Sequence, residues 1–89
     1  MQATDAEFKK ASDFIKVKKM AGLSNDQQLE LYALFKQGTE GDNKRDKSKV
    51  SGQVEEAKYN AWMKKTGMKS EDAKKQYVEL TKKHYKDYK

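Results

Sequence analysis

Two lysines stand beside aromatic residues in an arrangement that favours binding of an anion. The stretch LYALFKQGTEGD contains Lys36 directly after Phe35 and one helical turn beyond Tyr32, and the later stretch AKYNAW places Lys58 before Tyr59. A lysine supplies a point charge for phosphate, a phenol supplies a hydrogen bond, and a flat ring can stack on a purine. The combination indicates a nucleotide-like ligand, although either lysine alone could instead cover the rim of a core and keep its ammonium in water.

Catalytic chemistry finds little support in the sequence. The single histidine, His84, lies in a lysine-rich carboxyl-terminal run and is interpreted as a partly exposed helix residue, because a catalytic base needs a nucleophile or metal positioned beside it. No set of His, Asp and Glu has metal-ligand spacing, no phosphate-binding glycine loop occurs, and cysteine is absent. We therefore expect no enzyme, no metal and no cofactor.

The charge balance favours an anionic partner without choosing one. Twenty Lys and Arg against fourteen Asp and Glu give a formal net charge of +6. The runs DNKRDKSK, MKKTGMK and TKKHYKDYK fit a nucleic-acid binder, but acids are interspersed among the bases, and most such runs are solvated helix faces. We expect no nucleic-acid partner and keep a small basic helical nucleic-acid-binding protein as the alternative.

Length and composition limit the architecture. The 89 residues allow one small domain, 1–89, and 38% of them are charged. Three Phe, five Tyr and one Trp recur with the leucines at helical spacing, which argues for folding rather than disorder. No leader-like apolar region begins the chain and no run of about 18 apolar residues occurs, so we expect a soluble cytoplasmic protein.

Helical patterns account for nearly all of the chain. A Thr-x-x-Glu capping box at Thr4 predicts the start of a first helix that ends near Lys19 and carries an apolar face. Its members are Phe8, Ala11, Phe14 and Ile15. A second capping signal at Ser24 predicts a helix that ends near Gly38 and has two faces. One face holds Leu31, Leu34, Phe35 and Gly38, and the adjoining face holds Leu29, Tyr32 and Lys36.

The second half of the chain predicts a long loop and two more helices. Residues 39–52 are polar and flanked by glycine, which indicates an ordered or semi-ordered loop. A third helix over about 53–65 places an apolar set on one face, with Lys58 inside it; the set is Val54, Ala57, Ala61 and Trp62. A fourth helix starts at Ser70 and continues to the carboxyl end through Ala73, Tyr77, Leu80 and His84. Four helices predict an all-α four-helix bundle in which the long connection lets the second and third run in the same direction.

Three ordered motifs resemble those of a known family. YALFKQGTEGDN, AKYNAW and KKTGMKSEDAKKQYVEL follow one another in the manner of the acyl-CoA-binding protein family. The signature of that family is Tyr-x-x-Tyr-Lys-Gln-Ala-Thr-x-Gly-Asp, then Lys-Trp-x-Ala-Trp, then Lys-Gly-x-Ser-x-Glu-Asp-Ala and a later Tyr. The resemblance spans nearly all of the 89 residues and is weakest before Ser24.

The resemblance implies a fold, a ligand and a set of binding residues. It implies a four-helix bundle of up-down-down-up topology that carries long-chain fatty acyl-CoA through the cytoplasm as a monomer, without stable membrane insertion. The binding residues carried over by motif are Lys16, Tyr32, Phe35, Lys36, Lys58 and Tyr77. Among these, Tyr32, Lys36 and Lys58 would meet the ribose 3′-phosphate region, and the ring of Phe35 would contact the adenine.

Several positions depart from the family pattern. Phe35 replaces a tyrosine, which keeps the ring and loses a hydroxyl. Gly38 replaces an alanine, which weakens a helix end by up to ~1 kcal/mol. Tyr59 replaces a tryptophan, and the loop DNKRDKSKVSG lacks the Pro-Gly of the family. These differences bear on affinity and loop conformation more than on the class of ligand.

Overall fold

The computed structural model describes residues 3–88, and every regular element within them is helical. The elements are α1 (Ala3–Lys18), α2 (Asn25–Glu40), the short 3-10 turn η1 (Lys47–Lys49), α3 (Gln53–Met63) and α4 (Ser70–His84). The predicted all-α class is confirmed. None of these helices is long and apolar enough to cross a membrane.

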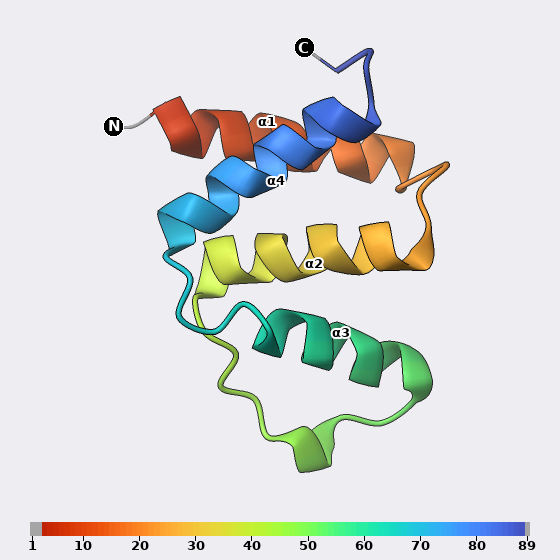
Figure 1. The fold of residues 1–89 in the computed structure, drawn as a ribbon, viewed down its shortest axis with the longest axis vertical. Helices are drawn as coiled ribbons and strands as arrows, with labels where there is room; N and C mark the ends of the chain where they lie inside the picture. Colours follow the sequence, from red (N-terminus) through yellow and green to blue (C-terminus); the bar gives the residue numbers. More distant parts are fainter. Residues whose placement is uncertain (1–2, 89) are drawn as a thin grey trace.

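The four helices form a flat molecule with α2 at its centre (Figure 1). Helix α2 packs against α4 on one side and α3 on the other, and α1 packs against α4. Helices α2 and α3 run in the same direction and α1 and α4 in the other, so the predicted up-down-down-up topology is confirmed (Figure 1). The molecule measures 40 × 31 × 16 Å, so it is about half as thick as it is wide. Helix α3 has essentially one neighbour, α2.

Local capping chemistry fixes the start of α2. The Ser24 hydroxyl accepts a hydrogen bond from the Gln27 backbone N–H at 3.2 Å, and the Gln27 side chain accepts one from the Ser24 N–H at 2.9 Å. This reciprocal pair is the predicted capping box and satisfies two amides that a helix start leaves free. The box predicted at Thr4 depends on a side chain outside the described residues, and the helix already includes Ala3.

Gly38 does not end α2 as predicted, because the helix continues to Glu40. A Cβ atom at this position would lie 3.0 Å from Lys74 Cγ and 3.5 Å from the ring of Phe8. The missing side chain therefore lets α4 and α1 approach α2 closely. The turn that follows the helix uses Gly41 instead, whose φ of 81° suits glycine.

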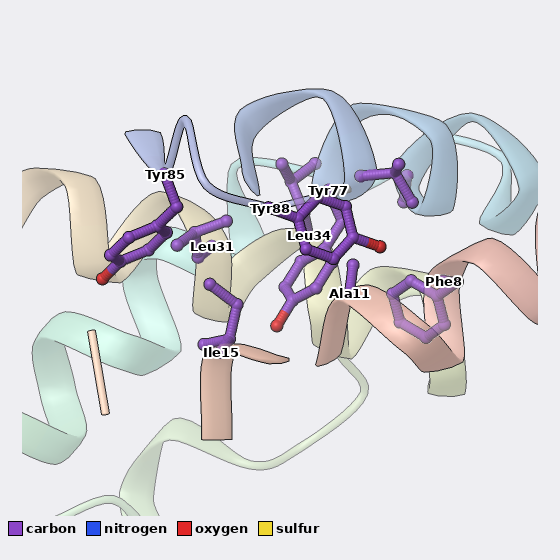
Figure 2. Packing of buried hydrophobic residues seen from close by; sticks show 10 residues of the cluster. Phe8, Ala11, Ile15, Leu31, Leu34, Tyr77, Tyr85 and Tyr88 are labelled. Carbon is purple, nitrogen blue, oxygen red and sulfur yellow. The ribbon is translucent and has the colours of Figure 1, made fainter. Parts of the chain in front are cut away.

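The main core lies where α1, α2 and α4 meet. Its buried side chains are Phe8, Ala11, Ile15, Leu31, Leu34, Ala73, Tyr77 and Val78, most of which appear in Figure 2. All of them except Val78 are among the positions predicted for the first, second and fourth helices. Leu31 and Leu34 are completely buried, so the core depends on α2 as its central element.

Helix α4 ends at His84 rather than running to the carboxyl end of the chain, which corrects the prediction. The segment after it turns back over α1, where Tyr85 and Tyr88 meet the ring of Phe14 edge-on. The Tyr85 hydroxyl donates to the backbone oxygen of Ala21 at 2.8 Å. Burial of these tyrosines is incompatible with a straight continuation of α4, and the folded-back segment anchors the connection between α1 and α2.

The apolar face predicted for the third helix is buried only in part, because Ala57 and Ala61 are half-buried. Trp62 is buried, but Val54 is 66% exposed, and the helix ends at Met63 rather than near Lys65. Tyr59, which the prediction left off this face, is buried by the 41–52 loop. Its hydroxyl donates to the backbone oxygen of Arg45 at 3.1 Å, and Trp62 Nε1 donates to that of Gly41 at 2.9 Å. The long loop is thus ordered by contacts with α3.

A hydrogen-bonded junction fixes the end of α2 to the connection between α3 and α4. Asp42 Oδ1 accepts from the Gly67 N–H and from Gln37 Nε2, both at 2.9 Å. The same Gln37 amide donates to the backbone oxygen of Met68 at 2.8 Å. The Gly67 and Gln37 hydrogen bonds lower the pKa of the Asp42 carboxyl below its ordinary value. The junction therefore holds α3 in its place beside α2.

Candidate functional site

The contact line between α2 and α3 carries alternating lysines and aromatic rings. Lys58 Nζ from α3 lies 5.4 Å from the centre of the Tyr32 ring on α2. Lys36 Nζ from α2 lies 5.1 Å from the centre of the Trp62 ring on α3. Each helix supplies one lysine and one ring four residues apart, so parallel packing pairs them crosswise. We call this contact line, formed by Tyr32, Lys36, Lys58 and Trp62, the seam between α2 and α3. The two predicted phosphate-binding lysines lie along it, about one helical turn apart.

The two lysines differ in their acidic partners. The Lys36 ammonium is bonded to the carboxylate of Glu40, four residues further along α2, and the Lys36 side chain is only 23% exposed. Lys58 is 38% exposed and lies 3.8 Å from a carboxylate oxygen of Glu55, which is a looser pair. Lys58 is accordingly the more available cation for a ligand.

An aromatic cavity of about 150 Å³ lies between α1, α2 and α4. It brings together four of the six predicted binding residues, which are Lys16, Tyr32, Phe35 and Tyr77. The Phe35 ring centre lies 5.9 Å from that of Tyr77. Burial raises the pKa of Tyr77 above its ordinary value, so its hydroxyl keeps its proton and remains a hydrogen-bond donor at neutral pH.

An apolar groove of about 450 Å³ runs between the amino-terminal halves of α2 and α3. Its apolar walls are Met20, Leu29, Val54 and Ala57, and Tyr32 and Lys58 stand at its edge. The exposure of Val54 therefore has an explanation, because its side chain faces this groove rather than a core. A further cavity of about 470 Å³ shares Leu29 and Ala57 with the groove, but apart from Ala61 its remaining lining is polar and charged, and it contains no aromatic ring.

Met20 was missed by sequence reasoning, although it lines both the aromatic cavity and the apolar groove. It lies in the connection after α1, where Lys19 and Met20 have φ values of 55° and 59°. Two successive left-handed residues other than glycine are uncommon and turn the chain sharply there. No periodic pattern marks a loop residue, so the sequence carried no signal for it.

The structure separates one predicted residue from the rest of the site. Lys36 lines neither the aromatic cavity nor the apolar groove and is directed at Trp62 and Glu40. The other five line one of them, and Tyr32 lines both. No group of three or more potential metal ligands occurs within residues 3–88. The arrangement combines cations, phenol groups and flat rings with an adjoining apolar surface, which suits binding of an amphipathic anion.

Comparison with known proteins places this geometry in a family. The sequence model described as Acyl CoA binding protein matches residues 5–81. The Caenorhabditis elegans protein Acyl-CoA-binding protein homolog 1 is 53% identical over 57 residues, and the Saccharomyces cerevisiae protein Acyl-CoA-binding protein is 44% identical over 57 residues. Each alignment covers 64% of this chain and 66% of the relative, just under two-thirds of its length.

A longer relative shows the same segment inside an enzyme. The rat protein Enoyl-CoA delta isomerase 2 is 40% identical over 81 residues, which is 90% of this chain but only 20% of that protein. Most of that enzyme therefore has no counterpart in the aligned segment. With the match over residues 5–81, the chain belongs to the acyl-CoA-binding protein family.

Proposed function

We propose that this protein binds one molecule of long-chain fatty acyl-CoA and carries it without catalysing a reaction. The observation that carries the proposal is the meeting of two unlike cavities at Tyr32, one aromatic and one apolar, with the Lys58 ammonium over the Tyr32 ring. An acyl-CoA has the same division into a flat charged head and an apolar tail. The names of the relatives agree with this ligand.

The aromatic cavity suits the adenine ring. Phe35 and Tyr77 supply aromatic surface, and the Tyr77 hydroxyl can donate a hydrogen bond. Lys16 lies exposed at the edge of this cavity, where its ammonium would meet the phosphates of the head. The cavity volume of about 150 Å³ limits it to a group of the size of a base.

The seam between α2 and α3 suits the ribose 3′-phosphate. Lys58 and the Tyr32 hydroxyl would contact this group directly, because Lys58 already stands over the Tyr32 ring. Lys36 would join them from one turn further along α2. Charge-assisted hydrogen bonds of this kind are about twice as strong as neutral ones.

The apolar groove suits the acyl chain. Its volume of about 450 Å³ and its apolar walls offer room for part of a long acyl chain. Removal of this apolar surface from water stabilises the complex by roughly 25 cal/mol per Å². Free fatty acid would gain the same burial but lose every contact of the head, so it should bind far more weakly.

The proposal also covers domain organisation, oligomeric state and location. In it, the protein is a single acyl-CoA-binding domain over 1–89, acts as a monomer in the cytoplasm and transfers its ligand unchanged. The isomerase activity named for the rat relative belongs to a protein of which the aligned segment is 20%. Nucleic-acid binding gains no support, since the partly buried Lys36, Lys65 and Lys74 each pair with a carboxylate of the same chain.

Native mass spectrometry of the protein purified from cells tests the proposal without presuming the ligand. We expect a population heavier by the mass of one acyl-CoA, with chains near sixteen carbons in excess. Protein that carries nucleotides or nucleic acid instead, and that gains no mass after incubation with palmitoyl-CoA, would contradict it.

A further inference from the structure

The carboxylate of Glu40 forms an ion pair with Lys36, one of the lysines proposed to bind the ligand. It bonds the Lys36 ammonium from the next turn of α2, while the same ammonium lies 5.1 Å from the centre of the Trp62 ring. Tyr32 lies one turn away from Lys36 in the opposite direction along the helix. The pair with Glu40 therefore draws the ammonium towards the carboxyl end of α2 and away from Tyr32 and Lys58.

The pair with Glu40 has no evident structural purpose. Other partly buried lysines connect separate segments: Lys65 reaches Glu30 on α2 at 2.6 Å, and Lys74 on α4 reaches Asp5 on α1 at 2.7 Å. Lys36 and Glu40 lie on one turn of one helix, so their ion pair joins no separate segments, and it is the contact of Lys36 with the Trp62 ring that reaches α3.

Glu40 is also poorly placed for helix stability. It is the last residue of α2, and the negative end of a helix disfavours a carboxylate. A lysine that precedes a glutamate by four residues is the weaker order of such a pair. A residue that does not stabilise the helix and holds a binding lysine is better explained by its effect on the ligand.

We infer that Glu40 is a built-in competitor for the ribose 3′-phosphate of the ligand. It holds Lys36 in the free protein and releases it when the phosphate arrives; the inference rests on the proposed function. The phosphate carries more charge than a carboxylate, and the released Glu40, whose side chain is already 53% exposed, remains hydrated. Glu40 thereby lowers the affinity for ligands that bear this phosphate and leaves others unaffected.

The test compares two ligands on two variants by calorimetric titration. Palmitoyl-CoA and 3′-dephospho-palmitoyl-CoA differ only in the group that Glu40 opposes. Glu40→Gln should bind palmitoyl-CoA about two- to fivefold more tightly, from the usual strength of such a pair, and should bind the dephospho ligand as the wild type does. Glu79→Gln is the matched control, because it removes the same charge from an exposed position on α4.

The possible outcomes distinguish a failure of the role of Glu40 from a failure of the proposed acyl-CoA binding. An equal gain for both ligands, an equal gain in the Glu79 variant, or no gain at all would overturn the role of Glu40 while acyl-CoA binding stands. A wild-type protein that fails to bind palmitoyl-CoA would instead overturn the proposed function, and this inference with it. Introduction of Glu40→Gln into Lys36→Ala should abolish the gain, and thermal melting of Glu40→Gln should be no lower than that of the wild type.

Discussion

The two halves of the molecule that share α2 are built differently. On one side, α1, α2 and α4 enclose completely buried residues such as Leu31, Leu34 and Ala11 (Figure 2). On the other side, α3 packs essentially on α2 alone (Figure 1). The apolar groove lies between these two helices. The first half holds the packed core that stabilises the fold, with the small aromatic cavity beside it, and the second half holds the larger apolar groove.

Helix α2 serves both halves with opposite faces. Leu31 and Leu34 point into the core, while Tyr32 and Lys36 face the seam with α3. Because a helix has 3.6 residues per turn, neighbouring residues in the sequence point in different directions, so one can pack in the core while the next faces α3. Substitutions on α2 should therefore separate stability from binding, and the predictions that follow test that separation in order of expected effect.

The largest effect is expected from Leu34→Ala. The side chain is completely buried, so the variant should lose about 3 kcal/mol of unfolding free energy through lost burial and a cavity. Urea denaturation measures this loss. The folded fraction should still bind palmitoyl-CoA within about twofold of the wild type. Unchanged stability together with lost binding would show that the two halves are not separable in this way.

Sequence reasoning succeeded where short-range rules decide the structure. The Ser24 capping box and the buried faces of α1, α2 and α4 follow from local hydrogen bonding and helical periodicity, and the structure has both. Tyr32 and Lys58 lie together in the structure, and their role in binding, which the motifs indicate, stays a prediction.

The sequence failed where the number of neighbours decides burial. Val54 lies on the apolar arc predicted for the third helix, yet it is exposed because α3 has one packing partner. Tyr59 is buried because a loop, and not a helix, covers it. Gly38 indicates a helix end in sequence and a close helix contact in space. Met20 and the partner of Lys36 likewise depend on contacts that no local pattern encodes.

Phe35 lies in the half formed by α1, α2 and α4, where it lines the aromatic cavity. Its substitutions compare the contribution of the ring with that of the hydroxyl that the family's tyrosine carries. Its ring contacts Phe8 and Tyr77 with centres 5.6 Å and 5.9 Å away. Phe35→Ala should therefore lower both stability, by about 2 kcal/mol, and acyl-CoA affinity. Phe35→Tyr should alter affinity by less than about threefold, since the ring is retained. A large gain with tyrosine, measured by calorimetry, would show that the hydroxyl matters more than the ring.

The seam lysines should affect binding alone. Lys58→Ala should weaken palmitoyl-CoA binding roughly tenfold by removing a charge-assisted hydrogen bond. Lys36→Ala should weaken it less, because Glu40 already engages this lysine in the free protein. Both should keep wild-type helicity by circular dichroism. If both variants unfold while any folded remainder binds normally, these lysines cover the core rim and do not bind the ligand.

The smallest expected effect is a change in the pH dependence of stability when the charge of Asp42, at the junction between α2 and the α3–α4 connection, is removed. Hydrogen bonds hold the pKa of this carboxyl below its ordinary 3.8 in the folded state, so it stabilises the fold fully above that value. That contribution is lost as the pH falls from 3.8 through the lower folded-state pKa. Asp42→Asn keeps an oxygen acceptor and removes only the charge. It should melt at a lower temperature than the wild type at pH 7, and the difference should shrink as the pH falls below 3.8.

Calorimetric titration with palmitoyl-CoA, CoA and palmitate tests the central claim that one site joins a head and a tail. The account predicts 1:1 binding of palmitoyl-CoA, with CoA and palmitate each bound far more weakly than the thioester. Absence of any saturable heat with palmitoyl-CoA, together with saturable binding of the same protein to duplex DNA, would contradict it.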